Sequence, residues 1–235
     1  MGVEMFCQGK TSSVKTTHMK RLVCARCQRA QSGCICPWIH PTPNATEVLI
    51  LQHPMEVNEV KGSARLLSLS LLNSRIEVGE LFDPMQLQEL LTAPWSANTS
   101  AQGQKQAILL YPELPQDIAK AKQIGSTPEK LNEPAQLRLV VIDGSWRKTR
   151  KMLYLNPLLQ SLPRLHLDAI PASKYLIRKA HRLDQLSTYE ATCAALMQLE
   201  GNVAKFAALL DSFDGFVQQH IQAKSSAMTT TSRHH

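Results

Sequence analysis

The sequence predicts an α/β fold in which a mostly parallel sheet is covered by helices on both faces. Two observations support this prediction. Strand-like and helix-like segments alternate along the chain, and the strand-like runs are apolar throughout rather than at every second residue. Such runs are typical of strands that are buried on both faces of a parallel sheet. The chain has 235 residues, of which 43% are hydrophobic, so one substantial core is expected.

Short apolar runs rich in β-forming residues predict the strands. The four main ones are residues 46–53 (TEVLILQH), 74–80 (SRIEVGE), 107–112 (AILLYP) and 137–143 (LRLVVID). A further strand is predicted at residues 163–168 (PRLHLD).

Helical spacing of apolar residues predicts the elements between and after these strands. They are residues 61–73, 84–91, 114–122, 146–155, 187–200 and 202–222. Ser187 and Glu190 have the spacing of a capping box, and Gly201 is expected to end that helix. Polar loops are expected at 92–106 and 123–136, and a basic loop at 169–186.

The order of these segments predicts four parts. They are a loose N-terminal tail at 1–20, a cysteine-rich knuckle at 21–40, a main domain at 41–222 and a C-terminal tail at 223–235.

The charge balance is basic: 26 Lys and Arg stand against 19 Asp and Glu, a net charge of +7. This permits an acidic partner such as RNA, although many basic proteins bind no nucleic acid. No run approaches the roughly 18 apolar residues of a membrane span, and the N-terminus has no apolar run fit for a signal peptide. We therefore expect a cytoplasmic protein whose cysteines are reduced.

Four of the six cysteines, Cys24, Cys27, Cys34 and Cys36, lie close together in the sequence. Cys-x-x-Cys places two thiolates on one ion from a tight turn, and four thiolates close a tetrahedral zinc site without an open position. The pattern therefore predicts a structural zinc knuckle. The alternative is a set of free or redox-active thiols.

The turn after residues 137–143 is the main candidate for chemistry. Asp143 ends the strand, Gly144 permits a sharp turn, and Ser145 is placed to cap the next helix. A carboxylate on such a turn can act as a general base, or it can only cap the helix or pair with Arg147. Trp146 can be either a core residue or a stacking platform for a base.

Parallel sheets form their sites at the carboxyl ends of the strands, which here are residues 111–112, 143–146 and the loop after 168. The helix at 146–155 is strongly basic near its start, and the loop before Ser187 is also basic. A helix start binds anions, and clustered cations bind phosphates. A solvated helix face and a mobile surface loop are the alternatives.

Several of these segments, taken in order, resemble the DTW-domain family of tRNA-uridine aminocarboxypropyltransferases. They are the cysteine knuckle, LILQHPMEVNEVKGSARLL, LLYP, VIDGSWRKTRKML and LIRKAHRLDQLSTYEA, which together extend from about residue 21 to 220. The family's Asp-x-Thr-Trp falls on Asp143 to Trp146. Ser145 stands where Thr is usual, so a hydroxyl is retained and only a methyl is lost.

The resemblance implies a SPOUT-like fold with a trefoil knot, which the sequence pattern alone would argue against because knots are very rare. It also implies a reaction. The 3-amino-3-carboxypropyl group of S-adenosylmethionine would move to N3 of a tRNA uridine, and 5′-methylthioadenosine would leave. S-adenosylmethionine and a structural Zn²⁺ are the implied cofactors, and tRNA is the implied partner. The oligomeric state stays open, with a monomer favoured.

The resemblance assigns roles to individual residues. Asp143 is the candidate base, and Ser145 and Trp146 complete the catalytic turn. The expected donor-binding residues are Leu110, Tyr111, Pro112, Ile142, Asp143, Gly144, Ser187, Thr188 and Glu190. The expected RNA-binding residues are Arg65, Lys148, Arg150, Lys151, Arg178, Lys179 and Arg182.

Three other functions remain open on the sequence. They are an RNA methyltransferase with the same fold and donor, a zinc-knuckle RNA-binding protein without catalysis, and a redox protein that uses Cys24 and Cys27.

Overall fold

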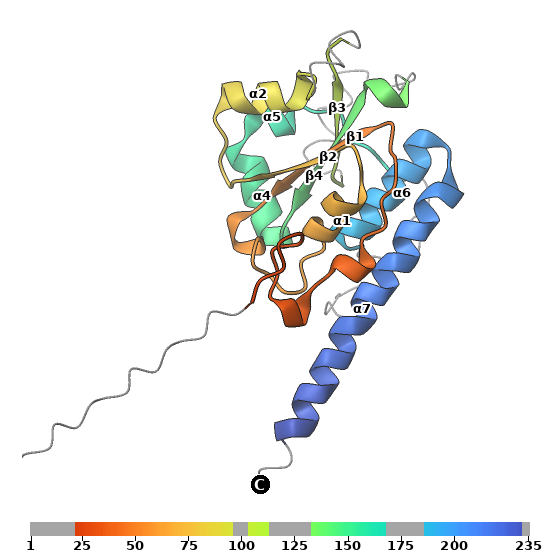
Figure 1. Cartoon of the computed structure of the whole chain (residues 1–235). Helices are drawn as coiled ribbons and strands as arrows, with labels where there is room; N and C mark the ends of the chain where they lie inside the picture. The colour runs from red at the N-terminus through yellow and green to blue at the C-terminus, as the bar shows by residue number, and fades with distance from the viewer. Residues whose placement is uncertain (1–21, 96–102, 113–132, 168–185, 232–235) are drawn as a thin grey trace, which may run out of the picture.

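The structure is a computed structural model that describes residues 22–95, 103–112, 133–167 and 186–231, with side chains described as far as residue 222. Its centre is a sheet of four parallel strands in the order β2–β1–β4–β3 (Figure 1). The strands are β1 (Glu47–Gln52), β2 (Ser74–Val78), β3 (Gln106–Leu110) and β4 (Leu137–Asp143). This confirms the predicted parallel sheet and the four main strands.

Helices cover both faces of the sheet, as predicted. One face carries α1 (Ala64–Ser70), α6 (Thr188–Glu200) and α7 (Val203–Thr231), and the other carries α2 (Pro84–Thr92), α4 (Trp146–Leu155) and α5 (Pro157–Gln160) (Figure 1). Short 3-10 turns lie at Gln31–Gly33, Cys36–Trp38, Pro54–Glu56 and Pro134–Gln136.

The central strands supply both cores because their side chains alternate between the two faces. In β1, Val48 and Ile50 join the core under α1, α6 and α7, whereas Leu49 and Leu51 join the core under α2 and α4. All six residues of β1 and all seven of β4 are buried. Burial on both faces explains why these strands read as continuous apolar runs.

The helix predicted at 61–73 is shorter than expected. It ends at Ser70 because Leu71 is extended and forms a parallel bridge with Thr42. The amide of Leu72 also donates to the carbonyl of Thr42, at 3.1 Å, so backbone pairing replaces the last helical turn.

The strand predicted at 163–168 was wrong in extent. The described residues there form one parallel bridge, between Leu109 and Arg164 beside β3. Pro163 has no amide hydrogen and contributes only its carbonyl, which accepts from Leu109 N at 2.9 Å.

The C-terminal helix is longer than the 202–222 that its periodicity predicts. α7 continues to Thr231, through most of the segment expected to be a tail. The helix predicted at 114–122 and most of the basic loop at 169–186 lie outside the described residues, as does the tail at 1–20. In the described part of the chain, no helix combines the length and apolar character that a bilayer crossing requires.

The cysteine knuckle docks on α7 (Figure 1). Trp38 Nε1 donates to Gln219 Oε1 at 2.5 Å, and Gln219 Nε2 donates to the carbonyl of Cys34 at 3.3 Å. The knuckle is therefore part of the same packed body as the sheet.

Candidate active site

Asp143 lies at the carboxyl end of β4, one of the two central strands, opposite Gln52 of β1. Gln52 Nε2 donates to its Oδ2 at 2.9 Å, and Thr188 Oγ1 donates to its Oδ1 at 2.7 Å. The side chain is buried, with the residue 7% exposed. The carboxylate is thus held in a fixed orientation at the position where parallel sheets form their sites.

Thr188 is placed by the predicted capping box at the start of α6. Glu190 N donates to Ser187 Oγ at 3.2 Å, and Ser187 N donates to Glu190 Oε2 at 2.9 Å. Gly201 ends the helix with a φ of 62°, also as predicted. The reciprocal cap fixes the first turn of α6 against Asp143.

Gly144 makes the turn after β4 compact. A Cβ at this position would lie 3.3 Å from Lys148 Cβ and 3.6 Å from His53 Cβ. Ser145 occupies the N-cap position of α4, but its side chain makes no cap hydrogen bond and is exposed. The prediction of a side-chain cap by Ser145 was therefore wrong, and its carbonyl accepts from Thr149 N instead, at 2.9 Å.

A cavity of about 190 Å³ opens beside the Asp143 carboxylate. Its walls come from the start of α6, the end of β4 and the segment between β1 and α1. The lining residues are Glu56, Glu59, Lys61, Gly62, Ser63, Asp143, Ser187 and Thr188. Three carboxylates and one ammonium group line this space, so it is acidic in a chain whose net charge is +7.

Five of the eight lining residues were given no role in the site from the sequence: Glu56, Glu59, Lys61, Gly62 and Ser63. They belong to the stretch MEVNEVKGS, residues 55–63, which begins three residues after the end of β1. The strand-end rule applied to residues 46–53 points to this stretch, because β1 and β4 end at the same edge of the sheet.

His53 is a structural residue beside the site. Its amide donates to the carbonyl of Asp143 at 3.0 Å, and its Nδ1 accepts from Met55 N at 3.1 Å. Nε2 therefore carries the proton and donates to Glu80 Oε1 at 3.0 Å. Hydrogen bonds from Lys151 and, to a smaller extent, His53 lower the pKa of Glu80.

Of the expected donor-binding residues, Asp143, Ser187 and Thr188 line the cavity. The others lie around it or away from it. Ile142 belongs to the core under α2 and α4, and Glu190 is buried in the cap. Leu110 ends the edge strand β3 and Tyr111 and Pro112 follow it, and none of the three is among the described residues that line the cavity.

Trp146 is half exposed, at 51%, so it is not a core residue. The ring of Tyr111 packs against it in a T-shaped arrangement, with centroids 5.7 Å apart and an interplanar angle of 73°. Tyr111 is held in turn by a 3.2 Å hydrogen bond between its hydroxyl and Thr149 Oγ1. These contacts keep the indole at the surface, at the start of α4.

The expected RNA-binding cations differ in their surroundings. Lys148 pairs with Glu56 at 2.8 Å and Lys151 with Glu80 at 2.9 Å, whereas Arg150 is exposed. Arg65 is half-buried and donates to the carbonyl of Arg26 at 3.4 Å. Arg178, Lys179 and Arg182 lie outside the described residues.

The four knuckle cysteines lie with their sulfur atoms within 4.8 Å of one another. Cys24 Sγ is 3.5 Å from Cys36 Sγ, and Cys27 Sγ is 3.8 Å from Cys34 Sγ. Four sulfurs at 2.3 Å from a tetrahedral Zn²⁺ lie about 3.8 Å apart, so the cluster has the dimensions of such a site.

The knuckle favours the thiolate form at Cys24, whereas burial raises the pKa of Cys36 to about 12. Hydrogen bonds from the backbone N–H groups of Cys27 and Arg26 lower the pKa of Cys24 to about 6. The thiolate is the form that ligates a metal. Cys193, by contrast, is a core residue that is fully buried in α6, where burial raises the pKa of its thiol.

Comparison with known proteins finds relatives that are named tRNA-uridine aminocarboxypropyltransferases. The chain is 29% identical over 192 residues to tRNA-uridine aminocarboxypropyltransferase 2 of Macaca fascicularis, covering 78% of this chain and 58% of that protein. It is 29% identical over 189 residues to the protein of the same name in Drosophila melanogaster, covering 77% of this chain and 68% of that one. With tRNA-uridine aminocarboxypropyltransferase A of Arabidopsis thaliana it shares 28% identity over 144 residues, 58% of this chain and 52% of the plant protein.

The chain covers 58% of the length of the macaque protein and 58% of the mouse protein of the same name, which is less than two thirds of each. No solved structure matches it. The DTW domain family, however, matches residues 21–221, from the cysteine knuckle into α7. This confirms the resemblance on which the expected roles were based, and the chain belongs to the DTW domain family.

Proposed function

We propose that this protein transfers the 3-amino-3-carboxypropyl group of S-adenosylmethionine to N3 of a tRNA uridine and releases 5′-methylthioadenosine. The names of the relatives and the family match support the reaction. The observation that carries it is the buried, oriented carboxylate of Asp143 in the wall of an acidic cavity at the carboxyl edge of the sheet.

The charge of the cavity suits the donor. S-adenosylmethionine carries a sulfonium and an ammonium group, and Glu56, Glu59 and Asp143 surround the space that would receive them. Its carboxylate would be oriented by the first turn of α6, where helix N–H groups and the helix dipole favour an anion. The same carboxylates stabilise the neutral thioether product less than the cationic donor, which favours release of the product.

The chemistry requires one proton transfer and one displacement. Asp143 would take the N3–H proton of uridine, and N3 would form a bond to the γ-carbon of the donor as the bond from that carbon to sulfur breaks. The electron pair of the broken bond goes to the sulfonium, which leaves as a neutral thioether. Gln52 and Thr188 hold the carboxylate in place for the transfer.

We also infer that the knuckle binds a structural Zn²⁺ through Cys24, Cys27, Cys34 and Cys36. The sulfur spacing and the full set of four protein ligands support this, since four thiolates leave no open coordination position. Replacing Cys24 with serine should release the metal and loosen residues 21–40. Unchanged zinc content in the reduced variant would reject the site. The SPOUT-like trefoil knot remains part of the proposal on kinship alone.

The test is transfer to unmodified tRNA with S-adenosylmethionine as the donor, followed by mass spectrometry of the digested RNA. Wild type should add the mass of an aminocarboxypropyl group to uridine. Asp143→Asn, which keeps the shape of the side chain, should lower the rate by roughly 10²–10⁴-fold if the carboxylate is the base. Gln160→Asn on α5 is the matched amide control.

The same test separates the proposal from two of the alternatives. A methyl mass on the RNA would replace the proposal with methyl transfer. No mass change despite tRNA binding would leave a non-catalytic RNA-binding protein. Wild-type turnover by Asp143→Asn would remove Asp143 from the mechanism.

A further inference from the structure

We propose that the outer face of α4 is the surface on which the tRNA lies, with Trp146 and Tyr154 as stacking platforms for two unpaired bases. This proposal rests on the proposed function, because it takes tRNA as the ligand. It adds Tyr154, which no sequence motif singled out, and it assigns different roles to the cations of the helix.

The two aromatic residues belong to one stripe of α4. Trp146, Arg150 and Tyr154 are spaced four residues apart, so they lie on the same side of the helix. With a rise of about 1.5 Å per residue, the two rings are separated by roughly 12 Å along the axis. Tyr154 is 78% exposed and Trp146 is 51% exposed, although large aromatic side chains are usually mostly buried.

Trp146 is a preformed platform. Its ring is held by a T-shaped contact with Tyr111, and the guanidinium of Arg164 lies 5.4 Å from the centre of the Tyr111 ring. A ring that is already fixed loses little conformational entropy when a base stacks on it.

The cations of α4 divide into two kinds. Lys148 and Lys151 are paired with Glu56 and Glu80. Arg147 and Arg150 are exposed, and neither forms an ion pair among the described residues. Their guanidinium groups are therefore available for phosphates, which they bind in a bidentate manner.

Aromatic rings interleaved with arginines favour single-stranded nucleic acid over an acidic protein surface, because every base offers a π-face and every nucleotide a phosphate. The position of the stripe agrees with this ligand. α4 begins three residues after Asp143, so RNA lying along the helix would pass the mouth of the acidic cavity. The target uridine would then turn from the stripe toward the carboxylate.

The test measures binding of an unmodified tRNA transcript to full-length, zinc-loaded protein by fluorescence anisotropy. Tyr154→Ala should weaken binding roughly tenfold, whereas Tyr154→Phe, which keeps the ring, should bind as wild type does. Met85→Ala is the matched control, because Met85 is also an exposed apolar residue, at 83%, but lies on α2. Arg150→Ala should reduce the dependence of binding on salt by about one counterion.

Wild-type affinity in Tyr154→Ala would overturn the proposal, as would an equal loss in Met85→Ala. Mass spectrometry of the same RNA separates this outcome from failure of the proposed function. Aminocarboxypropyl transfer with Tyr154→Ala binding unchanged rejects the surface alone. Weakened binding in Tyr154→Ala together with a methylated or unmodified product supports the surface and rejects the reaction.

Discussion

Arg29 of the cysteine knuckle donates from Nη2 to the carbonyl of Gly62, in the cavity wall, at 2.6 Å. Its Nη1 donates to the carbonyl of Val60, also at 2.6 Å, and its guanidinium lies 5.7 Å from the centre of the Phe216 ring on α7. One side chain therefore ties the knuckle, the cavity wall and the C-terminal helix together. The shape of the cavity depends on a segment far from it in sequence.

Replacing Arg29 with alanine should weaken the binding of S-adenosylmethionine by roughly tenfold, because two charge-assisted hydrogen bonds hold the wall segment in place. Arg29→Lys should recover only part of this loss, since an ammonium cannot donate in a fork. Isothermal titration calorimetry gives the affinity, and the metal content of each variant is measured beside it.

Arg26→Ala is the matched control, because Arg26 lies in the same knuckle with its side chain exposed. If Arg29→Ala keeps both its zinc and the wild-type affinity, the link between knuckle and cavity has no functional effect. Lost zinc in Arg29→Ala would instead show that the arginine acts by holding the knuckle itself.

Thr188→Val should lower kcat by about tenfold, because it removes the 2.7 Å hydrogen bond that orients Asp143 while keeping a β-branched side chain. Thr188→Ser restores the hydroxyl and should recover most of the rate. Steady-state kinetics with saturating tRNA and donor separates kcat from KM. A serine variant as slow as the valine variant would show that the methyl group, not the hydroxyl, is what matters.

Local signals in the sequence predicted the scaffold well. The apolar runs at β1 and β4, the capping box at Ser187 and the stop at Gly201 each reflect an interaction within a few residues, or burial on both faces of one strand. Asp143 was singled out for the same reason, because a polar residue that ends a buried parallel strand lies at the carboxyl ends of the strands, where such sheets form their sites.

The rest of the site depends on contacts between distant segments. The hydrogen bond between Thr188 and Asp143 and the pairing of Lys148 with Glu56 have no signature in local spacing. Leu110 and Tyr111 lie at the end of the edge strand β3, whereas the cavity lies at the other side of β4, beside β1. Strand order decides which strand ends meet, and the sequence pattern does not determine that order.

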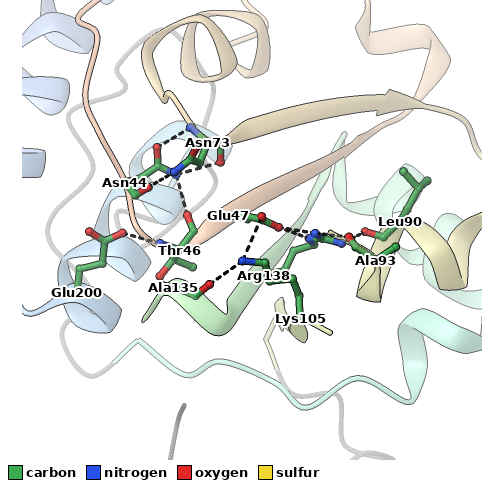
Figure 2. Close-up of polar contacts among 10 residues, drawn as sticks. All are labelled: Asn44, Thr46, Glu47, Asn73, Leu90, Ala93, Lys105, Ala135, Arg138 and Glu200. Atoms are coloured by element: carbon green, nitrogen blue, oxygen red, sulfur yellow. Dashed lines mark hydrogen bonds and ion pairs between the residues drawn. The ribbon is translucent and has the colours of Figure 1, made fainter. Parts of the chain in front are cut away.

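Glu47 joins two buried cations at the opposite end of the sheet (Figure 2). It pairs with Arg138, its neighbour in the β1–β4 register, and lies 3.3 Å from Lys105 Nζ. Glu47→Gln leaves both cations without their carboxylate, so the free energy of unfolding should fall by about 3–5 kcal/mol. Urea denaturation measures this.

Glu77→Gln provides the comparison, since Glu77 pairs with Arg75 at the surface and should contribute no more than about 1 kcal/mol. Equal losses of unfolding free energy in the two variants would mean that burial of the Glu47 pair adds nothing to stability. Figure 2 also shows Arg138 reaching the C-terminal end of α2, where it donates to the carbonyls of Leu90 and Ala93 at 2.6 and 2.8 Å. That end of the helix should loosen when the pair is broken.

Glu80 makes the stability of the fold depend on pH in the acidic range. Lys151 and His53 lower the pKa of this carboxyl below its ordinary 4.5, so the folded state binds the proton less readily than the unfolded chain does. The stabilisation is complete above 4.5 and is lost as the pH falls through the lowered pKa. Glu80→Gln should therefore reduce stability slightly at neutral pH and not at all in strong acid, as measured by urea denaturation across that range. An equal loss of stability at neutral pH and in strong acid would mean that the charge of the Glu80 carboxylate does not cause the effect.

Gly215 tests how the knuckle is seated on α7. An added Cβ would lie 2.0 Å from Trp38 Cζ3, too close for any small adjustment, so the indole would have to move and release its hydrogen bond to Gln219. Alanine in a helix normally stabilises by up to about 1 kcal/mol relative to glycine, whereas overpacking costs about 1–3 kcal/mol. Gly215→Ala should thus lower the melting temperature and shift the tryptophan fluorescence. Gly33→Ala, where nothing lies within 4 Å of the new Cβ, should leave both unchanged. A higher melting temperature in Gly215→Ala would mean that the helix preference wins and that Trp38 does not pack against this glycine in solution.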